Sequence, residues 1–295
     1  MPVPELLQSA ADVRRLEIMT RRIVNNVMAG EYHSAFKGSG MEFSEVREYR
    51  PGDDIRNIDW NVMARTGEPH IKRYVEQREL TVFFAVDVSA SSVFGSVKRR
   101  KRSLEAIVTA VLAFSAIRNN DRVGLMLFSD KVELFLPPKK GRKHGLRVIT
   151  ELIRQPEHRG TNITEALQTL NRLQRRKCIV FLISDFQEDD LRRALAVTAS
   201  RHDLISISIT DPREVTVPNV GLITLEDAET GETAMIDTSS GRVREALQER
   251  MKTRRDNLKR LFSSLKIDHI DLQTDADFST PLVNFFTARI RRKGG

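Results

Sequence analysis

Three oxygen-bearing side chains stand at alternate positions directly after an apolar segment of strand length. The segment is Leu80–Val86, and Asp87, Ser89 and Ser91 follow it. Along an extended backbone, alternate side chains point to the same side. These three groups can therefore face a single ligand.

Two further oxygen donors follow later in the chain. Asp185 comes just after the apolar run Cys178–Ile183, and Thr161 stands just before a helix expected to begin near Ile163. In an open α/β sheet, ligands bind beyond the carboxyl ends of the strands, where the loops converge. We therefore expect Thr161 and Asp185 to lie near Asp87.

The five groups together have the chemistry of a site for a hard cation. They are carboxylates and hydroxyls, with no His or Cys among them. Oxygen donors with only two carboxylates suit Mg²⁺ or Mn²⁺ better than Ca²⁺. Such a set leaves the cation short of charge and of ligands, so one position is open to an outside group, and the charge favours a carboxylate.

The elements that must position these side chains form an α/β domain over residues 80–290. Continuous apolar strands that alternate with helices indicate a parallel sheet covered on both faces. We expect an open, doubly wound, mostly parallel sheet of about six strands, with a hairpin insertion near 220–238. Strands are predicted at Leu80–Val86, Val123–Phe128, Lys131–Leu136, Cys178–Ile183, Leu204–Ile209 and Ile267–Leu272, and helices at Ser103–Ile117, Gly145–Ile153, Asn162–Leu173, Asp190–Ser200, Val243–Leu265 and Thr280–Ile290.

Residues 1–79 are expected to form an N-terminal elaboration packed on this core. Helical spacing of apolar residues predicts a helix over 5–29. Residues 30–80 are rich in turn formers, with short strands near Met41–Glu48 and His70–Glu76.

Three acidic residues in this segment could be mistaken for a second metal site. Asp53, Asp54 and Asp59 are close in sequence, but arginines surround them, and aspartates at turns accept backbone N–H bonds. We therefore predict an ion-pair network that locks the segment onto the sheet, with Trp60 as an anchor in that packing.

The site residues resemble the metal-ion-dependent adhesion site of von Willebrand factor A domains. The resemblance rests on Asp87-x-Ser89-x-Ser91, Gly160-Thr161-Asn162-Ile163 and Ile183-Ser184-Asp185. It implies that Ser89, Ser91 and Thr161 contact the cation, with Asp87 and Asp185 acting directly or through water. One departure is Phe186, where many such domains have Gly, and this side chain is expected to narrow access to the metal.

The N-terminal part resembles a narrower group, the bacterial domain-of-unknown-function family fifty-eight. The resemblance rests on Arg47-Glu-Tyr49-x-Pro51-Gly52-Asp53-Asp54-Ile-Arg56-x-Ile58-Asp59-Trp60 and extends through Asp211-Pro212-Arg213-Glu214. Members of this family carry a von Willebrand A-like domain and are often encoded beside MoxR-type AAA+ ATPases. The resemblance implies that such an ATPase works with this chain, in the assembly or maturation of protein complexes.

Charge leaves a second class of partner open. The net charge is +8, and residues 81–210 carry 22 basic and 13 acidic side chains, a net charge of +9. Such an excess can attract nucleic acid, but no aromatic residues interleave the basic runs to stack bases. Nucleic acid is therefore not the expected partner.

Other functional classes lack their sequence signals. The chain has no Walker A string and no Cys/His zinc spacing. It also has no apolar run of about 20 residues and no signal peptide. With a single cysteine, Cys178, it fits a reducing compartment. We expect a cytoplasmic protein without a membrane span.

These observations favour a non-enzymatic, metal-dependent protein-interaction module whose partner donates an acidic residue to the cation. Two alternatives stay open. The same cation could activate water in a hydrolase, although no general base is evident near the site. The basic 81–210 segment could bind nucleic acid, with an affinity that falls steeply with salt.

Overall fold

The computed structural model describes residues 16–20, 24, 29–36, 42–75, 79–89, 101–154, 160–216, 218–226 and 233–294. The chain divides into two compact units. The sheet unit comprises residues up to 35 and from 80 onward, and the inserted unit is Phe36–Glu79. The described residues before 36 thus group with the sheet rather than with the rest of the N-terminal segment. The packing of the inserted unit on the sheet stays a prediction.

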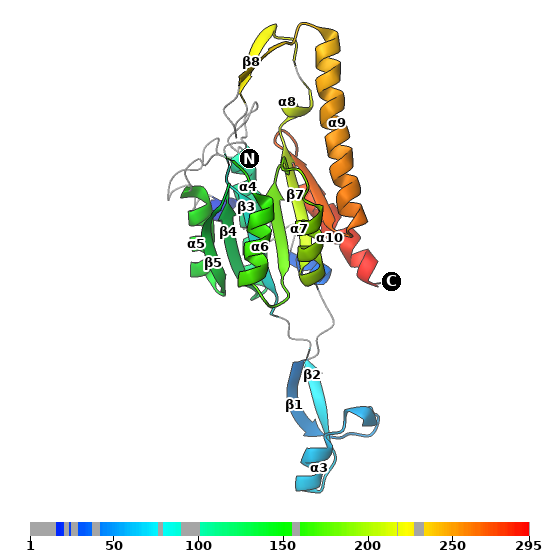
Figure 1. Ribbon diagram of the computed structural model, residues 1–295. Coiled ribbons are helices and arrows are strands. Elements are labelled where there is room, and N and C mark those ends of the chain that lie inside the picture. Colours follow the sequence, from blue (N-terminus) through cyan, green and yellow to red (C-terminus); the bar gives the residue numbers. More distant parts are fainter. Residues whose placement is uncertain are drawn as a thin grey trace. The chain divides into compact units, whose positions relative to one another are not determined.

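A six-stranded sheet forms the centre of the sheet unit (Figure 1), in the order β10-β7-β6-β3-β4-β5. All neighbours pair in parallel except β5, which runs antiparallel to β4 at one edge. The predicted fold class, α/β with a mostly parallel sheet, is therefore confirmed. The strands are β3 (Thr81–Asp87), β4 (Arg122–Phe128), β5 (Val132–Lys139), β6 (Ile179–Ser184), β7 (Asp203–Thr210) and β10 (Asp268–Gln273).

Helices cover both faces of this sheet. Side chains of α6, α7 and α9 join one face in a single apolar cluster, while α4 and α5 pack on each other and on β4. The helices are α4 (Lys101–Arg118), α5 (Arg142–Arg154), α6 (Ile163–Leu173), α7 (Arg192–Arg201), α8 (Pro212–Val215), α9 (Gly241–Ser264) and α10 (Ser279–Gly294). Of these, only the one-turn α8 has no counterpart among the predicted helices.

Burial along the central strands explains why they lack an alternating pattern. Phe83 and Ala85 of β3 belong to the cluster on the α6 side, and Phe84, which points the opposite way, is also fully buried. The Phe84 ring stacks on Phe181 of β6 with centroids 5.5 Å apart. A strand covered on both faces reads as a continuous apolar run, as Val82–Val86 of β3 does.

The helix α2 (Ala29–Phe36) precedes the inserted unit. Its Tyr32 is fully buried and meets Phe286 of α10 edge to face at 5.9 Å. The predicted helix over 5–29 lies mostly outside the described residues, although 16–20 are helical. Among the helices that the structure describes, none has the length and apolar character to cross a membrane.

The inserted unit is built on a two-stranded antiparallel ribbon of β1 (Glu42–Glu48) and β2 (His70–Val75). Between them lie a 3₁₀ turn, Ile55–Asn57, and α3 (Trp60–Thr66). These two helical pieces were not expected, because the turn formers around them conceal their short periodicity. A second ribbon, β8 (Leu222–Glu226) with β9 (Thr233–Asp237), is the predicted hairpin of the sheet unit.

Acidic residues of the inserted unit act as caps and ion-pair partners. Asp54 accepts the main-chain N–H of Arg56 at 2.9 Å, and Asp59 caps α3. Asp53 pairs with both terminal nitrogens of Arg47, and this bond is the main reason that the pKa of Asp53 falls below its usual value. Trp60 is 66% exposed, so the unit does not bury it, and its role as an anchor stays a prediction.

Candidate functional site

The first part of the site is a carboxylate fixed between two strand ends. Asp87 ends β3, and Ser184 ends the neighbouring β6. The Ser184 hydroxyl donates to Asp87 Oδ2 at 2.7 Å, and the main-chain N–H of Ser89 donates to Oδ1 at 2.9 Å. Asp87 is 2% exposed and Ser89 is fully buried. The Asp-x-Ser pattern therefore places its groups at the carboxyl edge of the sheet, as predicted.

Thr161 reaches the same edge from the loop before α6. The next residue, Asn162, donates its main-chain N–H to the carbonyl of Ser129, directly after β4, at 2.7 Å. The Asn162 side chain caps α6 by accepting from Glu165. Gly160 has a φ of +77°, a conformation that glycine adopts without a steric cost. This turn brings Thr161 beside the end of β4.

Two oxygen atoms at this edge are buried without a hydrogen-bond partner among the residues that the structure describes. They are Thr161 Oγ1 and Asp185 Oδ1. A buried polar atom that lacks a partner costs about 1–3 kcal/mol, so folded proteins rarely leave one in place. Oxygen atoms that lack donors are suitable ligands for a cation. The residues present therefore fit the predicted metal.

The fifth predicted ligand, Ser91, lies outside the described residues. Of the other four, Asp87 and Ser89 are in direct contact, while Thr161 and Asp185 occupy the adjoining loops. The described residues contain no cluster of three or more His, Cys, Asp or Glu able to hold a metal. A cation here would depend on the hydroxyls for much of its coordination.

A buried lysine, which sequence reasoning missed, contacts the site. Lys101, the first residue of α4, is 1% exposed. Its ammonium lies 3.4 Å from Asp185 Oδ2 and also pairs with Glu214 of α8. Burial alone would lower the pKa of Lys101, but the charges of Asp185 and Glu214 raise it above its usual value. In the sequence Lys101 is one of a run of basic residues, which indicates surface charge rather than burial.

Burial and neighbouring charge both act on the Asp87 carboxyl. Burial, together with the negative charge of Asp185, raises the pKa of Asp87 to about 7. Burial also raises the pKa of Glu105, one turn into α4, well above its usual value. The described residues of this edge thus bring several carboxyl groups together, and Lys101 is the one cation among them in contact with Asp185.

Glu188 connects two of the site's loops, and sequence reasoning missed it as well. Its carboxylate accepts the main-chain N–H of Ile163 at 2.5 Å and the hydroxyl of Thr164 at 2.6 Å. These donors belong to the first turn of α6, where helix N–H groups have no partners within the helix. Glu188 therefore ties the loop that carries Asp185 to the loop that carries Thr161.

Phe186 corrects one expectation. Its ring is 2% exposed and packs edge to face on Phe262 of α9, with centroids 5.2 Å apart. The ring belongs to the apolar cluster and does not narrow the approach to the site. The backbone of Phe186 has a φ of +54°, in the left-handed region that favours glycine. Glycine would adopt this conformation without a steric cost.

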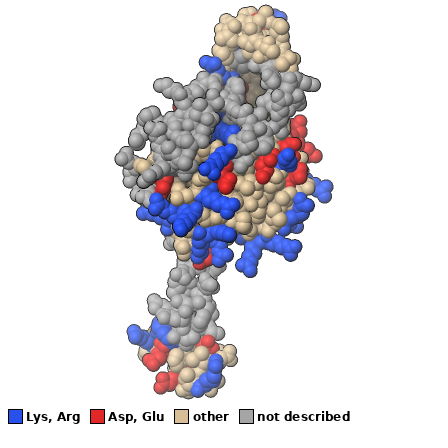
Figure 2. Space-filling model, turned by 90° about the vertical axis from the view of Figure 1, so that its left-hand side faces the viewer, with Lys and Arg blue, Asp and Glu red and all other residues tan. Residues whose placement is uncertain are grey.

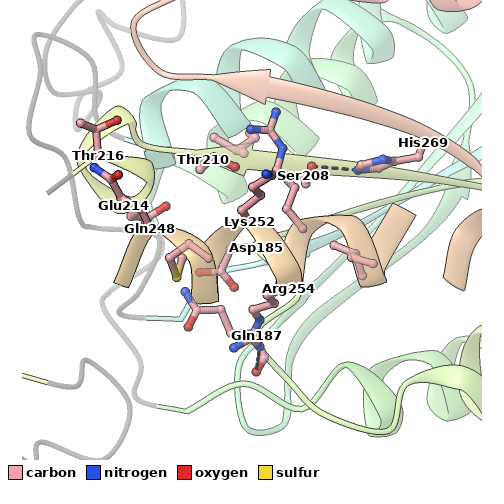
Figure 3. A pocket seen from close by; sticks show the side chains of 14 residues that line it. Asp185, Gln187, Ser208, Thr210, Glu214, Thr216, Gln248, Lys252, Arg254 and His269 are labelled. Carbon is pink, nitrogen blue, oxygen red and sulfur yellow. Dashed lines mark hydrogen bonds between the residues drawn. The ribbon is translucent and has the colours of Figure 1, made fainter. Parts of the chain in front are cut away.

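A cavity of about 290 Å³ adjoins the site. Its lining includes Asp185, Glu214, the last residues of β7 and His269 near the start of β10 (Figure 3). The opposite wall is α9, whose Lys252 and Arg254 also line the cavity. The sequence gives no direct signal for this cavity, because it forms between elements far apart in the chain.

Basic side chains are also visible on another face of the sheet unit. Figure 2 shows Lys and Arg residues distributed over this face, with Asp and Glu among them. Within the 81–210 segment, the basic run Lys139–Arg147 includes the start of α5, and there Arg142 pairs with Glu17 at 2.5 Å. Part of the positive charge of the 81–210 segment is therefore neutralised within the fold.

The fold and the site together define a class of protein. It is a doubly wound α/β domain with hydroxyls and carboxylates at the carboxyl edge of its sheet. Within this class, residues 45–257 match the family described as protein of unknown function DUF58, and the chain belongs to this family. Among its relatives, the uncharacterized protein Rv1480 of Mycobacterium tuberculosis is 31% identical over 286 residues, which cover 96% of this chain and 90% of the relative.

A more distant relative and two solved structures complete the comparison. The uncharacterized protein YeaD of Bacillus subtilis is 26% identical over 122 residues, 41% of this chain and 27% of the relative. The conserved hypothetical protein BatB of Bacteroides thetaiotaomicron is similar with a TM-score of 0.47 at 15% identity, covering 72% of this chain and 99% of that chain. The SpRpn10 VWA domain is similar with a TM-score of 0.39 at 13% identity, covering 70% and 95%.

Proposed function

We propose that this chain is a non-enzymatic protein-interaction module that holds a divalent cation at the edge of its sheet. The observation that carries the proposal is the pair of buried oxygen atoms, Thr161 Oγ1 and Asp185 Oδ1, that lack donors in the described residues beside the fixed Asp87 carboxylate. Ser89 and Ser91 complete the set of five ligands. The cation would be Mg²⁺ or Mn²⁺, because every donor is a hard oxygen.

When bound, the cation would offer an open coordination position to a carboxylate of another protein. The chain's own residues hold the cation at the sheet edge. The hydrogen bonds of Ser184 to Asp87 and of Glu188 to the first turn of α6 fix the positions of the loops that carry the ligands. Three of the five ligands are neutral hydroxyls, and Asp185 shares its charge with Lys101. The cation therefore stays attractive to an acidic side chain of a partner protein.

We infer that the partner machinery is a MoxR-type AAA+ ATPase, and that the pair assembles or matures protein complexes in the cytoplasm. Support comes from membership of the DUF58 family, to which residues 45–257 belong. The site on this chain would then hold the ATPase or its client through the cation, while the ATPase supplies the energy.

Metal binding is tested with Mn²⁺, which can be followed directly by electron paramagnetic resonance of the free ion. We expect stoichiometric binding to the wild-type chain and a loss of at least about tenfold in affinity for Asp87→Asn, since a charged ligand is removed. Asp275→Asn is the matched control, because Asp275 is exposed and lies outside the site. Equal affinity in all three proteins would overturn the metal site.

The partner is tested with the MoxR-type ATPase from the same organism, captured on the immobilised chain. A chelator alone is not decisive here, because ATPases need Mg²⁺ for their own nucleotide. The Asp87→Asn bait separates the two requirements. Capture on wild type and on Asp275→Asn, with loss on Asp87→Asn, supports a metal-bridged complex. Equal capture on all three baits contradicts it.

A further inference from the structure

Charges of both signs line the cavity beside Asp185. The carboxylates of Asp185 and Glu214 share the ammonium of Lys101, and two carboxylates against one ammonium leave a negative charge that a cation would neutralise. The wall formed by α9 is positive, because it presents Lys252 and Arg254 (Figure 3).

The two basic side chains of the α9 wall have no carboxylate partner within the described part of the chain. Arg254 donates to the main-chain carbonyls of Phe186 and Gln187, which are neutral acceptors, and no carboxylate of the described residues pairs with Arg254 or Lys252. Arg255, the next cavity residue on α9, differs because it pairs with Asp271 at 2.5 Å. Within the described chain, Lys252 and Arg254 are thus the two cavity cations left for a ligand.

The shape and lining of the cavity suit an extended peptide. About 290 Å³ is at the lower end of ligand cavities and accommodates one or two side chains. Ile209, Met251 and Leu258 give it apolar surface, and its described lining includes no Phe, Tyr or Trp on which a nucleic-acid base could stack. A cavity with apolar and basic surface next to the candidate metal site therefore favours an acidic peptide over a nucleic acid.

The helix that forms the wall continues the same charge. The 24 residues of α9 include eight basic and three acidic side chains, and Phe262 near its C-terminal end is the one buried residue of this helix. Figure 1 shows the N-terminal part of α9 extending past the carboxyl edge of the sheet. A segment lying in the cavity would have further basic residues along its path.

We propose that the cavity is the docking site for an acidic segment of the partner protein. One carboxylate of the segment reaches the cation held at Asp185, and a neighbouring carboxylate pairs with Lys252 and Arg254. This inference rests on the proposed function and adds to it the chemistry of the partner and the wall that recognises it.

The probe is a fluorescein-labelled hexaglutamate peptide, followed by fluorescence anisotropy with and without Mg²⁺ on the full chain. We expect binding of hexaglutamate and none of hexaglutamine. Lys252→Glu reverses one wall charge and is expected to weaken binding about tenfold. Because Lys252 is exposed and has no pair in the described residues, this variant leaves the core unchanged. Arg254→Gln gives a second, independent measurement.

The matched controls are Arg250→Glu and Arg260→Glu, which change the charge of the same helix equally but lie outside the cavity lining. If they weaken the peptide as much as Lys252→Glu does, attraction is general and the docking site is wrong. An absence of hexaglutamate binding also overturns it. Preferential binding of a single-stranded oligonucleotide, lost in Lys252→Glu, would assign the wall to nucleic acid instead.

The same assay separates this inference from the metal hypothesis. Binding that depends on Lys252 but is indifferent to EDTA and to Asp87→Asn retains the acidic docking wall and rejects the metal bridge. Binding that depends on Mg²⁺ and on Asp87 but is unchanged in Lys252→Glu retains the metal and rejects the wall. Dependence on both supports the complete proposal.

Discussion

The hydroxyl of Ser184 donates a 2.7 Å hydrogen bond to the carboxylate of Asp87. The same hydroxyl oxygen accepts the main-chain N–H of Phe186 at 3.1 Å. One side chain at the end of β6 thus orients a carboxylate on β3 and fixes the turn that carries Asp185. The two acidic residues of the site are therefore positioned together, although 97 residues separate Ser184 from Asp87.

Thr161→Val is expected to separate metal binding from stability. Because Thr161 Oγ1 is buried without a partner in the described residues, replacing the hydroxyl by a methyl group removes an unsatisfied group. Without metal, stability should be unchanged or higher by about 1 kcal/mol, while Mn²⁺ affinity falls. Thermal melting and Mn²⁺ titration measure the two effects. A lower melting temperature without metal would show that the hydroxyl has an internal partner.

Lys101→Met should make stability depend on the divalent cation. Removing the ammonium leaves the partly buried carboxylates of Asp185 and Glu214 without their shared cation. Breaking a fully buried pair costs about 3 kcal/mol or more, and partial exposure of the two carboxylates should reduce this to about 2 kcal/mol. Added Mg²⁺ should restore part of the loss, since it replaces the missing positive charge. Melting temperatures with and without Mg²⁺ give the answer.

The control for this variant is Arg292→Met. Arg292 pairs with Asp268 at 2.7 Å but is largely exposed, and such surface pairs contribute about 1 kcal/mol or less. Its small loss should be indifferent to Mg²⁺. An equal Mg²⁺ effect on both variants would argue against a specific role for Lys101 at the site.

Glu188→Ala is expected to weaken metal binding from outside the ligand set. The variant removes the carboxylate that holds the first turn of α6, which costs about 1 kcal/mol in stability. Thr161, two residues before Ile163, loses its fixed position as a result, and Mn²⁺ affinity should fall severalfold. Glu165→Ala changes charge at the same helix without removing the tie. If both variants lower the affinity equally, only the local charge matters.

Phe186→Gly sets two effects against each other. Glycine removes about 1 kcal/mol of steric strain from the left-handed backbone at this position. The loss of the buried ring costs about 3–5 kcal/mol. We expect net destabilisation, by roughly 3 kcal/mol, in denaturant unfolding. Asn120→Gly has a similar φ of +62° at an exposed position and should be neutral or slightly stabilising. A stabilised Phe186→Gly would mean that the ring contributes little to the core.

His269 should make stability decrease in mild acid. Burial is the main cause that lowers its pKa from 6.5 to about 4, so between these values the unfolded chain binds more protons than the folded chain. The contribution of the neutral His269 to the free energy of unfolding is fully present above pH 6.5 and decreases as the pH falls towards 4. At about 1.4 kcal/mol per pKa unit, and allowing for the partial exposure of His269, the loss is roughly 2 kcal/mol. His269→Gln should flatten this part of the pH profile of unfolding. An unchanged profile would assign the pH dependence to other groups.

The fold was largely predictable because its strands are covered on both faces. The apolar runs that become β3, β4 and β6 are too continuous for a sheet with one solvent-exposed face. Because parallel strands end at the same edge of a sheet, these runs also indicate which loops lie together. Asp87 and Thr161 could therefore be assigned to one site on sequence alone. Short pieces such as α3 and α8 were missed, since four to seven residues do not establish a helical period.

The residues missed at the site are those whose roles depend on tertiary packing. Lys101 has the sequence context of a surface lysine, and only the fold buries it against Asp185. Glu188 caps a helix that begins 25 residues earlier in the chain, a relation that local capping patterns do not contain. The ring direction of Phe186 likewise follows from α9, which is distant in sequence.

One carboxylate near the sheet closes the loop of chain that contains the inserted unit. Asp121 accepts the hydroxyl of Tyr32 at 3.3 Å and the main-chain N–H of Leu80 at 2.9 Å, and these residues stand just before and just after Phe36–Glu79. The departure and return points of the insertion are thus pinned side by side by a residue of the sheet unit. Such a junction lets the insertion be exchanged, enlarged or deleted as a self-contained cassette while the carboxyl edge of the sheet keeps its form.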